Sequence, residues 1–276
     1  MSTTATPQPP LDLSLVILNY HSAGLVRQCV RGIREATSEL NYEVVVVDNA
    51  SHDGCLKRLA LEFPEVVRVA LEVNRGYAAG NNAGLRLARG EFVAILNPDL
   101  TVLPGSLERL VAFMRSHPKA GVAGPKLVNP DGTLQLSSYR FPSFWLPLLR
   151  RTILGELPLA RGRLEAYLMA DWDHRDGRTV DWLLGACLVV RHTALGAVGL
   201  LDERFFLYVE DTDWCRRFWR HGWEVWYVAE VELVHFHERL SAQPPLAAAL
   251  FSRITWIHIS SWLKYFWKWR SQLQPR

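Results

Sequence analysis

FVAILNPDLTVLP, residues 92–104, contains the pattern that decides the fold. Its first five residues form an uninterrupted apolar run, which is typical of a strand buried on both faces. The run stops at Asn97-Pro98-Asp99, where proline fixes the backbone and has no ladder hydrogen bond to lose. A turn of this kind needs no acid, so Asp99 is a candidate ligand or catalytic group, with an ordinary Asx or proline turn as the alternative.

Three similar apolar runs precede this one, and segments with helical patterns alternate with the runs. The predicted strands cover residues 13–18, 43–47, 66–71 and 92–96, and the predicted helices cover 22–36, 53–63, 76–89 and 104–117. Strands that are apolar on both faces and alternate with helices predict an α/β fold with a mostly parallel central sheet flanked by helices. Ligands bind such sheets at the carboxyl ends of the strands. Polar residues stand at three of these ends, namely Asn19-Tyr20, Asp48-Asn49 and Asn97-Pro98-Asp99.

The second half of the chain has a different pattern. Asp131-Gly132 predicts a hairpin, and residues 141–178 are rich in Pro, Arg and Leu without a clear period, which suggests an insertion or a mobile lobe. Further elements are expected at 182–190 (a strand with Gly185-Ala186 in its middle), 210–221 (a helix closed by Gly222), 224–228 and 231–234 (short strands).

Composition excludes several classes of protein. The 276 residues are 49% hydrophobic, which argues against disorder, and a net charge of +3 argues against nucleic acid as the main partner. The four cysteines form no CxxC pair, so we expect reduced core thiols. MSTTATPQPP lacks the features of a signal peptide, and no run of 18 apolar residues predicts a membrane span.

Two segments of the first half contain candidate ligand contacts. Asp48 ends VVVVD, where a carboxylate can accept hydrogen bonds from a nucleobase or a ribose, although it could equally cap the turn that follows. In NRGYAAGNNAG, residues 74–84, Gly76, Gly80 and Gly84 share one helix face, where a ligand or a packed strand can approach closely. The spacing is not GxGxxG, so it does not predict a dinucleotide site.

Two segments of the second half contain titratable groups. FFLYVEDTDWCRR, residues 205–217, places Glu210, Asp211 and Asp213 within four residues of one another, and helix capping explains three acids less well than one. A carboxylate beside an aromatic cluster is a candidate base. His235 and His237 in VELVHFHERLS are candidate metal ligands.

The chain resembles the inverting family 2 glycosyltransferases, in particular the bacterial rhamnosyltransferase-like branch. The motifs shared with this family, in the family's order, are SLVILNY, VVVVDNASHDG, NRGYAAGNNAG, ILNPDL, WLLGACLVVR and GLLDERFFLYVEDTDWCRR. The resemblance implies the GT-A fold, with a nucleotide-binding α/β half fused to an acceptor-binding half. We therefore expect a disordered lead-in (1–11), a nucleotide-sugar-binding half (12–128), an acceptor-binding and catalytic half (129–241, with the insertion at about 141–178) and a C-terminal amphipathic helical tail (242–276).

The resemblance also implies roles for individual residues. Asp48 would contact the nucleoside base, and Asp99 with His235 would bind the Mg²⁺ or Mn²⁺ of the donor diphosphate. Asp211 would be the catalytic base, with Glu210 as the alternative. The other residues implied in nucleotide-sugar binding are Asn19, Tyr20, Asn74, Arg75, Gly76, Asn81, Asn97, Gly185 and Ala186. Asn97 departs from the family pattern, because many members have Asp at this position, as the first acid of Asp-x-Asp. The site of this chain therefore has one negative charge fewer.

The expected reaction is an in-line displacement at the anomeric carbon with inversion of configuration. The sequence resembles enzymes that use dTDP-L-rhamnose, with a cell-surface glycan or a polyprenyl-linked saccharide as the acceptor. A UDP-hexose donor, a catalytically inactive nucleotide- or glycan-binding relative, and a nucleotidyltransferase are the alternatives. A nucleotidyltransferase is disfavoured because such an enzyme usually has a glycine-rich loop with Arg or Lys just after the first strand. LNYHSAGL, which stands at that place here, has no basic cluster.

The tail, residues 251–276, has five Lys or Arg residues, no acid and four tryptophans. On a helix, Arg253, Ser260, Lys264, Lys268 and Ser271 would form a narrow polar stripe beside a wide Trp-rich apolar face. This pattern predicts an interfacial helix that binds the anionic, cytoplasmic face of the membrane peripherally. The alternative is a helix packed on the domain or in a homodimer interface.

Overall fold

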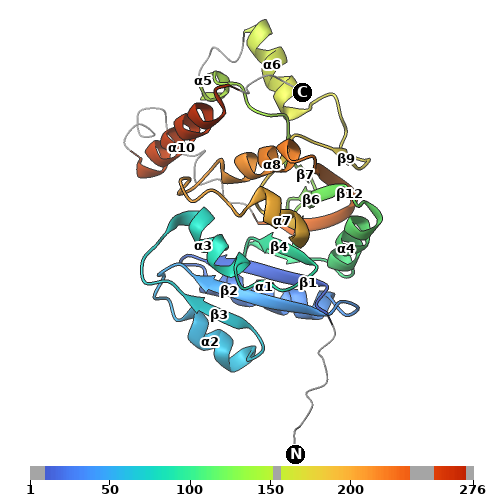
Figure 1. Ribbon diagram of the computed structural model, residues 1–276, viewed down its shortest axis with the longest axis vertical. Coiled ribbons are helices and arrows are strands. Elements are labelled where there is room, and N and C mark those ends of the chain that lie inside the picture. Colours follow the sequence, from blue (N-terminus) through green and yellow to red (C-terminus); the bar gives the residue numbers. More distant parts are fainter. Residues whose placement is uncertain (1–9, 152–156, 237–251, 272–276) are drawn as a thin grey trace, which may run out of the picture.

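The computed structural model describes residues 10–147, 149, 157, 158, 160–236 and 252–271, together with the backbone at 148, 150, 151 and 159 (Figure 1). In the first half, strands and helices alternate as the sequence predicts. The strands are β1 (Leu13–Asn19), β2 (Tyr42–Asp48), β3 (Val67–Ala70) and β4 (Phe92–Leu96), and the helices are α1 (Ala23–Ala36), α2 (Cys55–Glu62) and α3 (Gly76–Leu85). These four strands pair in parallel, and Asn19 lies beside Asp48 in the register of β1 and β2.

The second half adds strands of both directions to the same sheet. Its elements are β5 (Leu100–Val102), α4 (Ser106–Ser116), β6 (Ala120–Val128), β7 (Leu134–Gln135), β8 (Ser138–Tyr139), α5 (Leu146–Arg151), α6 (Pro158–Leu168), β9 (Arg178–Thr179), β10 (Trp182–Leu183), β11 (Cys187–Arg191), α7 (His192–Val198), α8 (Glu210–Arg220), β12 (Glu224–His235) and α10 (Arg253–Trp269). The strand order is β3-β2-β1-β4-β11-β6-β12-β5, and β11 runs antiparallel to both of its neighbours. The α/β fold with a central sheet between helices is confirmed; the four strands of the first half pair in parallel, and β6 and β12 form a further parallel pair.

The apolar residues form one core on each face of the sheet. One core joins the sheet to α1, α2 and α4, and the other joins it to α3, α7 and α8. On α3, a Cβ at Gly80 or Gly84 would lie 2.6 Å from Leu18 or 2.5 Å from Val16, so these two glycines serve helix packing. Gly76 is different, because its φ is +82° and a Cβ would lie 2.3 Å from the carbonyl oxygen of Phe206.

Four predicted elements differ from the structure. The strand predicted at 182–190 is divided, since β10 pairs with β8 in a small separate sheet and β11 joins the main sheet. The strands predicted at 224–228 and 231–234 are one strand, β12, with an irregular register between Val228 and Glu232. The helix predicted at 76–89 ends at Leu85, and Gly90 instead lies against the backbone of β1, where a Cβ would be 2.6 Å from the Ser14 nitrogen.

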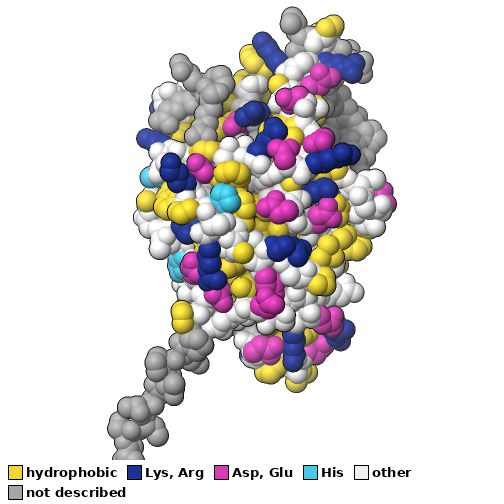
Figure 2. All heavy atoms as spheres, turned by 90° about the vertical axis from the view of Figure 1, so that its right-hand side faces the viewer, with side chains coloured by type: hydrophobic (Ala, Val, Ile, Leu, Met, Phe, Trp, Pro, Cys, Tyr) yellow, Lys and Arg dark blue, Asp and Glu magenta, His cyan; other side chains and the backbone are white. Residues whose placement is uncertain are grey.

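The surface carries charges of both signs. On the side of the molecule that includes α4 and β9, basic and acidic side chains are interspersed instead of gathering into a patch of one sign (Figure 2). The sheet runs from one half into the other, and the boundaries given for the four parts of the chain stay predictions.

Candidate active site

A hydrogen-bond network connects the carboxyl ends of β1 and β2. Asn19 is fully buried, and its amide nitrogen donates to Asp48 Oδ1 at 2.8 Å and lies 3.2 Å from the Asp53 carboxylate. Its amide oxygen accepts from the Ser22 N–H at 3.1 Å. Burial favours the protonated form of Asp53, but hydrogen bonds from Cys55, Asn19 and Ala23 outweigh it and lower the pKa of this carboxyl. The network therefore fixes two carboxylates at one edge of the sheet.

The turn before α3 is fastened to the same edge. The Asn49 amide nitrogen donates to Asn74 Oδ1 at 2.9 Å and to the Gly76 carbonyl at 3.2 Å. The Arg75 N–H donates to Asn49 Oδ1 at 2.9 Å, while the Arg75 guanidinium is half exposed and 3.9 Å from Glu203. The backbone of residues 74–76 thus lies beside the end of β2.

Tyr77 joins this edge to the second half. Its hydroxyl lies 2.6 Å from the Gly185 carbonyl and 3.0 Å from Asn97 Oδ1, and its single proton satisfies one of these acceptors at a time. Burial raises the pKa of Tyr77 well above its ordinary value, and the neighbouring carboxylates Glu210, Asp211 and Asp99 raise it further. Sequence reasoning missed Tyr77, although this tyrosine lies inside the NRGYAAGNNAG motif.

Gly185 and Ala186 contribute backbone groups to the site. The Gly185 N–H donates to Asp211 Oδ2 at 2.9 Å, and the Ala186 carbonyl accepts from the Asn97 N–H at 2.8 Å. Asp211 Oδ1 also accepts from the Thr212 N–H at 2.7 Å. Two of the three residues between β10 and β11 therefore hold both Asp211 and the turn after β4.

The two adjacent acids at the start of α8 lie in different surroundings. Glu210 is buried, and its Oε2 has no hydrogen-bond partner among the described residues. Burial and the charge of Asp211 raise the pKa of Glu210 well above 4.5, so this carboxyl stays protonated when Asp211 ionises. Burial also raises the pKa of Asp211, but hydrogen bonds from Gly185 and Thr212 oppose that shift. Both carboxyl oxygens of Asp211 thus accept hydrogen bonds, whereas Glu210 Oε2 accepts none from the described residues.

Asp99 and His235 form the second group that can bind a ligand. His235 Nδ1 lies 2.5 Å from Gln135 Oε1, an acceptor, so this nitrogen bears the ring proton of a neutral imidazole. Its Nε2 lies 3.3 Å from Asp99 Oδ1, which accepts no hydrogen bond from the described residues. Two ligands at right angles around a divalent cation are about 3 Å apart when each bond is about 2.1 Å.

The pair therefore fits a divalent cation that takes its remaining ligands from elsewhere. The described ranges contain no group of three or more His, Cys, Asp and Glu side chains that could bind a metal by themselves. A hard cation bound through phosphate needs only one or two protein ligands. Gln135 is a further residue that sequence reasoning missed, while His237 lies outside the described residues.

Tyr20 and Asn81, both predicted to bind the donor, have other contacts in the structure. Tyr20 follows the end of β1, is 51% exposed, and its ring packs against His21. Asn81 is fully buried in α3, and its amide nitrogen donates to the Tyr77 carbonyl at 3.0 Å. Asn81 thus supports the helix that presents Tyr77.

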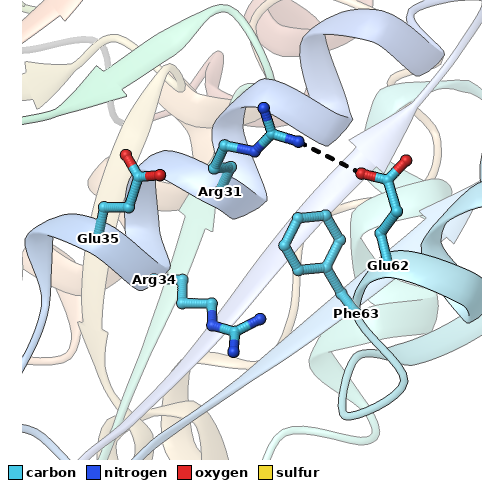
Figure 3. Close-up of a pocket in the computed structure, with 5 residues that line it drawn as sticks. All are labelled: Arg31, Arg34, Glu35, Glu62 and Phe63. Atoms are coloured by element: carbon cyan, nitrogen blue, oxygen red, sulfur yellow. Dashed lines mark hydrogen bonds and ion pairs between the residues drawn. The ribbon is translucent and has the colours of Figure 1, made fainter.

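A hollow between α1 and α2 lies apart from these groups (Figure 3). It is lined by Arg31, Arg34, Glu35, Glu62 and Phe63, and Arg31 and Glu62 form an ion pair across it at 3.4 Å. These residues come from the later turns of α1 and the end of α2, whereas the site begins at Asn19, before α1. The hollow is therefore not part of the candidate active site.

The chain is similar to proteins that transfer sugars. It is 29% identical to the N-acetylglucosaminyl-diphospho-decaprenol L-rhamnosyltransferase of Mycobacterium tuberculosis, over 93% of this chain and 86% of the relative. It is 26% identical to the low-salt glycan biosynthesis hexosyltransferase Agl10 of Haloferax volcanii, over 81% of this chain and 67% of the relative.

Solved structures share the fold. GalNAc-T7 with UDP, GalNAc and Mn²⁺ matches 96% of this chain and 52% of its own, with a TM-score of 0.62 and 15% identity. S. aureus TarS 1–349 in complex with UDP-GlcNAc matches 85% of this chain and 62% of its own, with a TM-score of 0.58 and 17% identity. The family model "Glycosyl transferase family 2" matches residues 14–169. The chain therefore belongs to glycosyl transferase family 2 and is a glycosyltransferase.

Proposed function

We propose that the site transfers a sugar from a nucleotide donor to an acceptor hydroxyl with inversion at the anomeric carbon. The observation that supports this most directly is the contact chain from Asn97 through Tyr77 and Gly185 to Asp211. Three contacts thus join a backbone-held carboxylate to the turn that contains Asp99.

Asp211 would accept the proton of the acceptor hydroxyl as that oxygen attacks the anomeric carbon. The new bond forms as the bond from that carbon to the nucleoside diphosphate breaks, and the pair of electrons leaves with the diphosphate. Glu210, protonated and buried behind Asp211, keeps the pair from bearing two charges at once.

Asp99 and His235 would bind Mg²⁺ or Mn²⁺ in this scheme. When bound, the cation would neutralise the charge on the departing diphosphate. The 3.3 Å separation of Asp99 Oδ1 and His235 Nε2 supports the assignment, as does the Mn²⁺ named with the structural neighbour GalNAc-T7. The Asn19–Asp48–Asp53 network and the 74–76 turn would bind the nucleoside.

We further propose L-rhamnose from dTDP-L-rhamnose as the transferred group and a lipid-linked saccharide as the acceptor. The support is the similarity to the mycobacterial L-rhamnosyltransferase over most of both chains. A UDP-hexose donor is the alternative, because two structural neighbours are named with UDP or a UDP-sugar.

A panel of nucleotide sugars tests the proposal. The purified protein is incubated with dTDP-L-rhamnose, UDP-glucose, UDP-galactose or GDP-mannose and Mg²⁺ or Mn²⁺, and release of nucleoside diphosphate is measured. We expect the highest rate with dTDP-L-rhamnose. Preference for another donor would reject rhamnose alone, and binding of nucleotide without release from any donor would favour the inactive relative.

Peripheral binding to an anionic membrane is the last part of the proposal, and α10 supports it. The outer face of α10 bears exposed apolar residues (Trp256, Ile259, Leu263 and Trp267), with the exposed cations Arg253 at the first residue of the helix and Arg270 immediately after its last. Lys264 is also exposed, but its Nζ donates to the Arg204 carbonyl of the domain, so it is not counted on this face. Phe144 and Trp145 are also exposed, and Phe144 contacts α10 through the buried Phe266. No described helix is both long and apolar enough to cross a bilayer.

The structure corrects the predicted polar stripe. Lys268 is turned toward the domain and pairs with Asp202 and Asp213, so it does not belong to the outer face. Tyr265, Phe266 and Trp269 of the predicted apolar face are also buried against the domain. The outer face therefore combines cations with aromatic side chains other than the buried ones. A helix face of this composition binds the interfacial region of a bilayer.

Flotation with phosphatidylglycerol-containing vesicles tests this binding. The wild type should float, and a variant with Trp256→Ser, Leu263→Ser and Trp267→Ser should not. Leu61→Ser removes an exposed apolar residue from α2 and is the matched control. If the triple variant floats like the wild type, the outer face is not the binding surface. A wild type that stays in solution as a dimer, together with a monomeric triple variant, would favour the homodimer alternative.

A further inference from the structure

The inner face of α10 contacts the segment that leads into the catalytic acids. This segment, residues 202–209, joins α7 to Glu210 at the start of α8. Ser261 Oγ donates to the Leu207 carbonyl at 2.9 Å, and Lys264 Nζ donates to the Arg204 carbonyl at 2.9 Å. Tyr265, Phe266 and Trp269 form a small buried apolar core with Phe205 and Val209 of the segment. The helix thus supports the segment through both its backbone carbonyls and its apolar side chains.

A buried ion-pair network fixes both ends of the same segment. Asp213 is fully buried and accepts from Lys268 Nζ at 2.8 Å, from Trp269 Nε1 at 2.9 Å and from Arg217 Nε at 3.0 Å. Lys268 also donates to Asp202 Oδ2 at 2.8 Å. One ammonium group of α10 therefore connects the residue that begins the segment to the first turn of α8.

The segment needs such support because its last two residues are strained. Tyr208 has φ of 69° and Val209 has φ of 73°, in the left-handed region that residues with a Cβ rarely adopt, and a β-branched residue least of all. Strain of this kind persists only when the surrounding contacts determine the conformation. Val209 is immediately followed by Glu210 and Asp211, so its conformation sets where both carboxyl groups point.

The segment also contacts the other half of the site. The Phe206 carbonyl accepts from the Tyr77 N–H at 2.7 Å and leaves no room for a Cβ at Gly76. Tyr77 in turn contacts Asn97 and Gly185 through its hydroxyl. A shift of the segment would consequently move Tyr77 as well as the acids.

From these contacts we infer that Ser261, Lys268 and Trp269 of α10 are positioning residues for the reaction, acting through the 202–209 segment on Glu210 and Asp211. The inference rests on the proposed role of Asp211 as the base. It gives the C-terminal helix a catalytic function in addition to the proposed membrane contact, with the two functions on opposite faces of one helix.

Three substitutions test the inference in lipid-free solution, with nucleoside diphosphate release as the assay. Ser261→Ala and Trp269→Phe each remove one hydrogen bond and keep most of the packing, and each should lower kcat about fivefold. Lys268→Met should lower it about a hundredfold, since a displacement near 1 Å of a reacting group has that effect. Lys268→Arg retains the charge and should recover most of the loss.

The controls separate positioning from folding. Ser260→Ala is the matched control for Ser261→Ala, because Ser260 is the adjacent residue and is exposed. The KM for the donor and the affinity for dTDP should stay within about twofold of the wild type in all variants, since no hydrogen bond among the described residues joins α10 to the Asn19 network. If Lys268→Met does not fold, the two milder variants decide the question. Wild-type kcat in both Ser261→Ala and Trp269→Phe would overturn the inference.

Hydrogen exchange distinguishes failure of the inference about α10 from failure of the proposed function. The amides of residues 205–209 should exchange faster in Ser261→Ala than in Ser260→Ala, whether or not a donor has been found. Unchanged exchange in Ser261→Ala would overturn the support given by α10. A wild type that releases no nucleoside diphosphate would instead reject the proposed function and leave the exchange result intact.

Discussion

Asn19 and Glu210 are both almost completely buried, but their polar atoms lie in different surroundings. Asn19 uses its amide nitrogen and its oxygen in hydrogen bonds with neighbours at the ends of β1 and β2. Glu210 keeps one carboxyl oxygen without a partner among the described residues and follows a backbone turn with two strained residues. The region around Asn19 therefore uses its amide in hydrogen bonds, whereas the region around Glu210 contains a buried carboxyl oxygen without a hydrogen-bond partner among the described residues.

This difference separates binding from chemistry. A bonded amide network is rigid before the ligand arrives, so it can present fixed acceptors to a nucleoside without reorganisation. A carboxylate that must take a proton needs a raised pKa, which burial gives to Glu210 and Asp211. Substitutions in the first region should therefore change KM, and substitutions in the second should change kcat.

Asp211→Asn should have the largest effect. The amide keeps the shape and most hydrogen bonds of the carboxylate but cannot accept the acceptor's proton, so kcat should fall by about 10² to 10⁴. Affinity for dTDP, measured by calorimetry, should be unchanged. Glu210→Gln is the comparison, since glutamine imitates the protonated acid, and it should retain most of the rate. The reverse ranking of the two variants would assign the base to Glu210.

Asp99→Ala should come next, because it removes one of the two protein groups proposed to bind the cation. Turnover should fall by about a hundredfold or more, in keeping with a loss of several kcal/mol of charge stabilisation, and EDTA should do the same to the wild type. Mn²⁺ binding in the presence of dTDP, followed by electron paramagnetic resonance, should weaken in the variant. Full activity in excess EDTA would remove the metal from the proposal.

Asn19→Ala should raise the KM for the donor about tenfold, because it removes hydrogen bonds to two carboxylates. Its kcat should stay within about threefold of the wild type, since the residue makes no contact with the acids of α8. Asn41→Ala, which alters an asparagine just before β2 at the opposite edge of the sheet, is the matched control. A kcat effect larger than the KM effect would break the separation between the two regions.

The sequence pattern predicts the Asn19 region better than the Glu210 region, for a physical reason. Parallel strands buried on both faces have a distinctive apolar pattern, and their carboxyl ends must meet at one edge, so the Asn19–Asp48 contact follows from the pattern. In the second region the decisive contacts join residues far apart in the chain. Tyr77 and Gly185 are separated by 108 positions, and nothing in either local pattern indicates their hydrogen bond.

The tail shows a second limit of sequence patterns. Helical periodicity predicts that residues 251–276 have a polar stripe and an apolar face, and residues 253–269 are indeed a helix, α10. Periodicity does not show what a face contacts, so Lys268 was grouped with the exposed cations although it pairs with Asp202 and Asp213. The division of the strand at 182–190 was likewise hidden, because both pieces are apolar and only the pairing partners differ.

The smallest expected effect concerns stability and distinguishes a protonated Glu210 from an ionised one. Its pKa is raised in the folded protein above the ordinary value of 4.5, so the folded state retains a proton that the unfolded state releases. The wild type should thus lose stability as the pH rises from about 4.5 toward the folded-state pKa. Glu210→Gln cannot ionise, so its Tm relative to the wild type should increase over that range. A difference in Tm that is constant between pH 4.5 and 8 would show that Glu210 has no raised pKa, and the contrast with the fully bonded Asn19 region would then lose its electrostatic basis.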